Sequence, residues 1–153
     1  LNLGLEYKGF DLSALISAQI GQEIFRAFEP TGLRVNSLRY WLNRWTPDNP
    51  NTDIPRVTTQ GSNLLSSDFY VEDASFMRVR NLQIGYTLPQ ALTDKIRLKK
   101  VRVYFSGNNI LTLTNYRGLD PEVGTNGWVL NTGIDRISYP VARSLGGGIN
   151  VSL

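Results

Sequence analysis

The protein contains no cysteine and no histidine in its 153 residues. These absences exclude thiol nucleophiles, disulfide bonds, imidazole bases and most zinc chemistry, so we expect neither an enzyme nor a cofactor or metal site. Charged residues make up 19% of the chain, below the roughly 25% typical of soluble domains. The net charge is only +3 and the basic residues are scattered, so no nucleic acid partner is expected. No apolar run approaches the roughly 20 residues of a membrane helix.

What the sequence does contain is a two-residue alternation of apolar and polar side chains, the pattern of β-strands with two different faces. It predicts strands over residues 1–7, 10–21, 75–87, 99–114 and 139–153, with a tight turn at Lys8-Gly9. Near Arg80 the phase of the alternation reverses, which indicates either a β-bulge or a passage from membrane to water. Because the alternation is already under way at Leu1, we expect a piece of a longer chain.

Two long stretches, residues 22–73 and 115–138, lack this alternation and predict long loops. The first contains one helical pattern, with apolar residues at positions i, i+3, i+4 and i+7: Leu38, Trp41, Leu42 and Trp45. Asn36 or Ser37 can serve as its N-cap, and the proline-rich segment 46–55 ends it. We therefore predict one short helix in the first loop.

Alternation also occurs in soluble β-sandwiches, but three features favour a membrane barrel. The polar face carries mainly Ser, Gly, Asn, Gln and Thr, which suit a partly hydrated lumen. Several patterns exceed the roughly 9–11 residues that a tilted strand needs to cross a bilayer. Short and long connections alternate along the chain, as outer-membrane barrels place short turns in the periplasm and long loops outside. About five strands cannot close a barrel alone.

Four stretches of the sequence closely resemble those of one family. They cover residues 71–89, which include Arg78-Val79-Arg80-Asn81-Leu82, residues 103–116, residues 118–123 and the proline-rich residues 45–55. These stretches are similar to the SusC/RagA family of TonB-dependent outer-membrane transporters, and the resemblance covers nearly the whole chain. It implies an all-β fold over residues 1–153: the C-terminal antiparallel strands of a transmembrane β-barrel with long extracellular loops.

The resemblance also implies a function in the outer membrane. The family imports oligosaccharides, or peptides in some members, and works with a SusD-like surface lipoprotein. Import is powered through TonB, which would act on the missing N-terminal part, because the plug domain matches nothing here. Outer-membrane lipid and a glycan or peptide substrate are the other expected partners. A secreted β-sandwich that binds carbohydrate is the alternative prediction.

The final residues resemble the signal that the barrel-assembly machinery reads. That signal has a glycine followed by alternating hydrophobic positions, which Gly148, Val151 and Leu153 match. The usual terminal aromatic residue is replaced by Leu153. We therefore predict that these three residues direct assembly of the strands into the outer membrane.

Five loop residues are candidates for contact with the ligand or the lipoprotein lid: Trp41, Trp45, Tyr116, Arg117 and Trp128. Exposed loop tips often carry function, and aromatic rings can stack on sugars. Each aromatic residue has a simpler interpretation, since a ring can also anchor its own loop. The helical spacing of Trp41 and Trp45 favours anchoring.

Three further groups have a functional and a simpler interpretation. Closely spaced oxygens in the segment 48–53 can bind calcium or form turns, and we favour turns. Asp120 and Glu122 flank Pro121, and a turn is again favoured over a hydrolase pair. Arg78 and Arg80 either face an acidic substrate in the lumen or lie above the membrane band. A membrane-surface girdle explains the aromatic residues near strand ends: Tyr7, Phe10, Tyr86 and Tyr139.

Overall fold

The computed structural model describes residues 1–28, 37–58, 61, 65–123 and 132–152. The chain divides into two compact units. The sheet unit comprises Leu1–Gln22, Asp73–Glu122 and Tyr139–Leu153, and the loop unit comprises Glu23–Glu72 and Val123–Ser138. Within the described part of the chain, no helix combines the length and the apolar character needed to cross a membrane.

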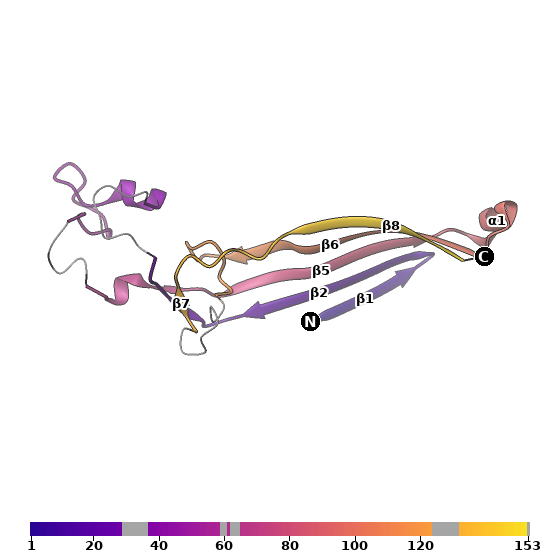
Figure 1. Cartoon of the computed structure of the whole chain (residues 1–153), viewed down its shortest axis with the longest axis horizontal. Coiled ribbons are helices and arrows are strands. Elements are labelled where there is room, and N and C mark those ends of the chain that lie inside the picture. Colours follow the sequence, from indigo (N-terminus) through magenta and orange to yellow (C-terminus); the bar gives the residue numbers. More distant parts are fainter. Residues whose placement is uncertain (29–36, 59–60, 62–64, 124–131, 153) are drawn as a thin grey trace. The chain divides into compact units, whose positions relative to one another are not determined.

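The sheet unit is built from five antiparallel strands that lie side by side in the order β1-β2-β5-β6-β8 (Figure 1). Their bounds are Asn2–Tyr7, Phe10–Gln19, Phe76–Thr87, Lys100–Thr114 and Ser144–Ser152. The all-β fold and all five strands predicted from the alternation are confirmed. The last strand begins at Ser144 and not at Tyr139, where the alternation predicted it. Pro140 has no N–H to donate, and the N–H of Val141 bonds to a loop carboxylate instead of to a strand.

The register of the strands places like residues in continuous rows across the sheet. One apolar row is Tyr7, Phe10, Tyr86, Val103 and Ile149, and one polar row, three positions along each strand, is Gly4, Ser13, Gln83, Ser106 and Gly146. Side chains of the apolar face are strongly exposed, with Val103 at 45%, Phe105 at 52% and Ile149 at 65%. Water would oppose an apolar surface of this extent, whereas lipid accepts it.

A β-bulge explains the reversed phase near Arg80. Leu15 and Ile16 of β2 pair with Asn81 and Val79, so that Arg80 is the extra residue of β5. The irregularity continues into β6, where Asn109 adopts a positive φ of 51°. Of the two interpretations left open by the sequence, the bulge is therefore confirmed, and it brings Arg78 and Arg80 to the same loop carboxylate.

The short connections lie at one end of the sheet. Lys8 and Gly9 form the predicted turn with φ angles of 47° and 87°, the positive values that a two-residue hairpin needs. A Cβ at Gly9 would lie 2.8 Å from the carbonyl oxygen of Thr87, so glycine is required there for space as well. The β5–β6 connection contains the short helices α1 (Gln90–Thr93) and η4 (Asp94–Ile96), which the alternation did not predict.

The loop unit contains a small sheet in the order β4-β3-β7, with bounds Val71–Asp73, Glu23–Arg26 and Ile134–Asp135. Strands this short carry too few residues for a visible alternation, and the sequence did not predict them. The predicted helix is a 3-10 helix, η1 (Arg39–Asn43), which Leu38 precedes without any side-chain cap. The predicted N-cap at Ser37 is thus wrong, and Asn36 lies outside the described residues. A second 3-10 helix, η3 (Asp68–Tyr70), leads into β4.

Arg26 organises the loop unit and is only 1% exposed. Its guanidinium forms an ion pair with Glu72 at 3.0 Å and donates hydrogen bonds to the Tyr40 hydroxyl at 2.7 Å and the Phe69 carbonyl at 3.1 Å. It also lies 5.4–6.0 Å from the ring centroids of Tyr40, Phe69 and Tyr70. A buried cation is tolerated when it is paired and hydrogen-bonded in this way.

Candidate functional site

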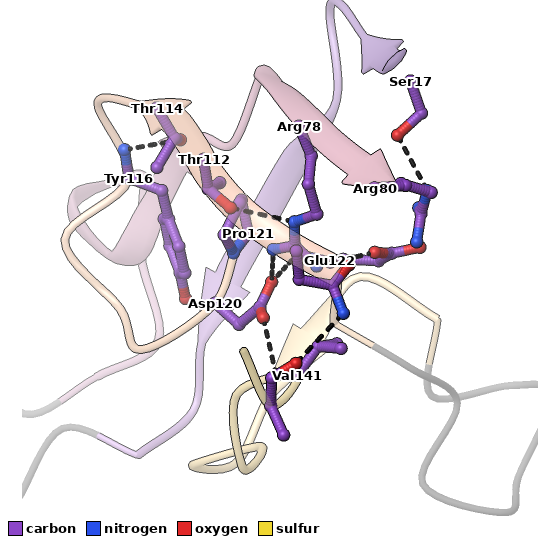
Figure 2. A network of polar contacts seen from close by, with 12 residues as sticks. Ser17, Arg78, Arg80, Thr112, Thr114, Tyr116, Asp120, Pro121, Glu122 and Val141 are labelled. Carbon is purple, nitrogen blue, oxygen red and sulfur yellow. Dashed lines mark hydrogen bonds and ion pairs between the residues drawn. The ribbon is translucent and has the colours of Figure 1, made fainter. Parts of the chain in front are cut away.

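The polar face of the sheet unit carries a network of charges at its long-loop end (Figure 2). Arg78 of β5 is its centre and is 2% exposed. Its guanidinium donates to the Thr112 hydroxyl of β6 at 2.9 Å, to Asp120 Oδ1 at 2.5 Å and to Glu122 Oε2 at 3.0 Å. The guanidinium N–H groups thus have three acceptors, and the two carboxylates among them neutralise the buried charge without any further ligand.

Arg80 extends this network along the bulge. It donates to Glu122 Oε1 at 2.6 Å and to the Ser17 hydroxyl of β2 at 2.8 Å. The side chains of Arg80 and Glu122 remain 33% and 37% exposed. Glu122 therefore bridges both arginines, and neither cation is held ready for an acidic substrate. The structure gives Arg78 and Arg80 a structural role, which neither of the two interpretations from the sequence included.

Asp120 closes the stem of the second long loop. Its carboxylate accepts the backbone N–H groups of Glu122 at 2.9 Å and of Val141 at 3.0 Å, which lie on the two sides of the loop. Burial alone would raise the pKa of Asp120, but these N–H groups and the Arg78 guanidinium outweigh it and hold the pKa below its usual value. A carboxylate held as an anion is a poor general acid, and the bond to Glu122 is that of the favoured turn.

Gln22 connects the stems of the two long loops. Its side-chain amide donates to the Pro121 carbonyl at 2.6 Å, and its own carbonyl accepts the N–H of Ala74 at 2.8 Å. Gly21 donates its N–H to the Ser75 hydroxyl at 3.0 Å beside it. We call this set the loop-stem network: Gln22, Arg78, Arg80, Thr112, Asp120, Glu122 and the Val141 N–H. It fixes together the points at which the chain leaves the sheet for each loop.

The loop residues predicted to contact a ligand or lid fall into different environments. Trp41 stacks on Tyr40 at 5.3 Å between ring centroids and lies 6.0 Å from Phe69, so it is packed within its own loop. Tyr116 is 6% exposed, and its ring covers Gly118. Trp45 is 37% exposed and Arg117 is exposed. Trp128 lies outside the described residues; Trp41 and Trp45 belong to the loop unit, and Tyr116 and Arg117 to the sheet unit.

The proline-rich segment forms turns. The Asn49 side chain donates to carbonyl oxygens of Asn43 and Arg44 at 3.2 and 3.3 Å, and the Thr52 hydroxyl donates to the Asn43 carbonyl at 2.7 Å. The Asn49 amide and the Thr52 hydroxyl thus hold the segment against the end of η1. No cluster of three acidic, histidine or cysteine side chains able to hold a metal occurs among the residues that the structure describes.

Gly148 and Val151 of the predicted assembly signal lie in β8, and Leu153 lies outside the described residues. Val151 is 54% exposed on the apolar face. Gly148 lies in a polar row with Tyr104, Gly85 and Asp11. The role of these residues in assembly stays a prediction.

Sequence reasoning missed most of the loop-stem network. It identified Asp120 and Glu122 as a turn and left two interpretations of the arginines, but it did not connect them. The sequence signal that could have connected them is the pair Arg78 and Arg80, two residues apart where the phase of the alternation reverses. A bulge at such a point can direct both arginine side chains toward one partner. Nothing local marked Gln22, whose partner lies 99 residues away.

Comparison with known proteins gives relatives over nearly the full chain. The chain is 39% identical over 157 residues to TonB-dependent receptor P3 of Formosa agariphila and 29% identical over 142 residues to TonB-dependent receptor SusC of Bacteroides thetaiotaomicron. These matches cover 98% and 92% of the chain but only 16% and 13% of the relatives. No family model matches the chain.

Solved structures agree with these relatives. The RagAB peptide importer in its open-open state superposes with a TM-score of 0.76 and 30% identity, over 99% of this chain and 16% of that one. The chain thus spans about one sixth of the length of the proteins that it matches. None of these relatives is named as an enzyme.

The two-faced sheet and these likenesses define the class of protein: the strands are part of an outer-membrane β-barrel with long extracellular loops. More narrowly, the chain belongs to the SusC/RagA family of TonB-dependent receptors. The predicted family, fold class and outer-membrane location are confirmed.

Proposed function

We propose that this chain is the C-terminal part of the barrel wall of a TonB-dependent nutrient importer. The complete protein takes up oligosaccharides or peptides and works with a SusD-like lipoprotein at the cell surface. An N-terminal plug, which residues 1–153 do not include, makes the contact with TonB. The observation that carries this proposal is the five-stranded sheet with one exposed apolar face and one face of small polar residues.

The polar face supports a role in passage of a solute. Its middle row contains Ser13, Gln83, Ser106 and Gly146, so it offers small hydrogen-bonding groups rather than fixed charge. Charges gather instead toward the two ends of the sheet, where Arg78, Arg80 and Arg102 are each paired with a carboxylate. A wall of this kind suits neutral, strongly hydrated solutes such as oligosaccharides or peptides.

Among the loop residues, Trp45 and Arg117 are the better candidates for contact with ligand or lid. Trp45 offers a partly exposed ring three residues along the chain from Leu42, which is 75% exposed, whereas the rings of Trp41 and Tyr116 pack against residues of their own loops. A partly exposed aromatic ring with an apolar neighbour is a typical anchor in an interface. Trp128 remains a candidate from the sequence alone.

The direct test uses the full-length receptor in its own outer membrane with its lipoprotein. Uptake of labelled oligosaccharides and of labelled peptides is measured separately, with and without an energised inner membrane. Energy-dependent uptake of one class supports the proposal and identifies the substrate. Equal accumulation in cells lacking the receptor contradicts it.

A second measurement examines the lid. Trp45→Ala is expected to weaken co-purification of the lipoprotein or binding of substrate, while the receptor remains folded. Trp41→Ala serves as the matched control for a packed tryptophan, with loss of loop order as its main effect. If Trp45→Ala changes neither partner, Trp45 is not a contact residue.

The secreted β-sandwich is the weaker alternative. A sandwich buries the apolar face of one sheet under a second sheet of similar size. The only other sheet in the described residues has strands of three, four and two residues. Such a sheet is too small to cover the apolar rows of the sheet unit.

A further inference from the structure

Two glycines occupy one polar row near the short-turn end of the sheet. The row runs Asp11, Gly85, Tyr104 and Gly148 across the strands β2, β5, β6 and β8. A glycine inside a strand removes a side chain from the face and weakens the strand, unless something approaches closely there. In this row a neighbouring side chain lies over each glycine.

Gly85 lies beneath the ion pair that crosses β5. Arg102 of β6 reaches over it to Asp11 of β2, with Nε donating to Oδ1 at 2.8 Å and a second, shorter contact between Nη2 and Oδ2. A Cβ at Gly85 would lie 2.5 Å from Asp11 Oδ1 and would also overlap the Arg102 guanidinium. Only glycine allows this pair to connect strands that are not neighbours.

Gly148 lies beneath the ring of Tyr104. A Cβ there would lie 2.7 Å from the hydroxyl oxygen and 2.8 Å from the adjoining ring carbon. The ring therefore lies across β8, on the opposite side of β6 from the Asp11–Arg102 pair. The guanidinium of Arg102 lies 5.2 Å from the centre of this ring, so the two side chains also support one another.

The strand that Tyr104 covers has a weak register of its own. β8 contains three successive glycines, Gly146 to Gly148, and pairs with β6 on one side among the described residues. The alternation of faces opposes a slip of one residue but not of two, and glycine-rich strands are prone to slip. An aromatic ring that fits only over a glycine can fix the register of such a strand.

We propose that Arg102, Tyr104 and the two glycines form a clasp that sets the register of β8 against β6. β6 holds β2 through Arg102 and β8 through Tyr104, both at the same level of the wall. Gly148 would then be required for the structure of the folded barrel wall, independently of recognition by the assembly machinery. The inference depends on the barrel strands and not on the substrate that the complete protein carries.

The test measures register directly, with cysteine pairs in the full-length receptor in outer membranes. Val101 pairs with Val151 in the observed register, and the slip of two residues that moves Tyr104 from Gly148 to Gly146 brings Val101 opposite Ile149. Residues 1–153 contain no cysteine, so the pairs Val101→Cys/Val151→Cys and Val101→Cys/Ile149→Cys report the two registers by disulfide formation. Cysteines elsewhere in the receptor are first replaced.

We expect the first pair to dominate in the parent sequence. Gly148→Ala should reduce the ratio of the first to the second crosslink at least about fivefold, as overpacking strain of one or two kcal/mol would do. Tyr104→Ala in the Gly148→Ala background should restore part of that ratio by removing the clash. Tyr104→Phe should keep the parent ratio because the ring remains.

Gly146→Ala is the matched control on the same strand and face. A Cβ there would lie 3.7 Å from the Ser106 hydroxyl, an ordinary contact, so the crosslink ratio should not fall. An unchanged ratio in Gly148→Ala would overturn the proposal. So would a Gly148→Ala/Tyr104→Ala double variant whose effects simply add, since a steric clasp requires that they do not.

Discussion

The two ends of the same sheet hold their charges in different ways. At the long-loop end Arg78 is buried beneath the second loop and pairs with the loop carboxylates Asp120 and Glu122. At the short-turn end Arg102 and Asp11 both come from strands, remain 19% and 27% exposed, and meet over a glycine. Where a loop covers the polar face, loop and wall neutralise one another. Where no loop covers it, the pairing is between strands.

The buried pair should be the more costly one to break. Asp120→Ala leaves Arg78 buried without its closest partner and releases the N–H of Val141, and we expect a loss of about 3–5 kcal/mol in the free energy of unfolding. Denaturant unfolding of the full-length receptor in lipid vesicles measures it. Glu122→Gln is the control, with a smaller loss because that side chain is 37% exposed. Equal losses would mean that burial does not distinguish the two carboxylates.

Between the two ends, the apolar rows should tolerate no charge. Val103→Arg or Ile149→Arg should cost about 2–4 kcal/mol if these residues lie near the middle of the bilayer. Ser106→Arg, on the opposite face of β6, should cost less because its side chain meets the lumen. The same vesicle measurement ranks the three variants, and the reverse ranking would show that the faces are inverted.

The strand-to-strand pair at the short-turn end should matter less than the loop-to-wall pair. Arg102→Met should lower the free energy of unfolding by less than Arg78→Met does, because water reaches the Arg102 pair and screens it. Raising the salt concentration should reduce the effect of Arg102→Met and leave that of Arg78→Met largely unchanged. A larger loss for Arg102→Met would reverse the comparison of the two ends.

The smallest expected effect is a dependence on pH at the long-loop end. Since the folded-state pKa of Asp120 lies below its ordinary value of 3.8, its stabilising contribution is present above that value and is lost as the pH falls through the folded-state pKa. The difference in stability between the parent receptor and Asp120→Asn should therefore shrink in acid. A difference that grows as the pH falls would contradict the assigned charge state.

The sequence predicted the strands well because each spans enough residues to show the alternation. β5 and β6, with 12 and 15 residues, carry it on both sides of the bulge. The strands of the loop unit are too short for that signal, and the 3-10 helix η1 has the apolar spacing of an α-helix over little more than one turn.

The candidate site was harder to predict because its contacts are distant in sequence. Arg78 meets Asp120 across 42 residues, and no local pattern connects them. The row of Asp11, Gly85, Tyr104 and Gly148 becomes visible only when the register of three strand pairs is known. The glycines within the strands indicated small residues that face the lumen, but only the structure shows which side chains lie over them.

The most direct test of the account is the reactivity of single cysteines placed along β6 in the full-length receptor, with other cysteines replaced. A water-soluble thiol reagent is applied to membranes that carry Val103→Cys, Phe105→Cys, Ser106→Cys or Asn108→Cys. We predict that positions 106 and 108 react while positions 103 and 105 are protected, and that a lipid-soluble reagent reverses this pattern. Equal reaction of both sets with the water-soluble reagent would contradict the assignment of this sheet to a membrane barrel wall.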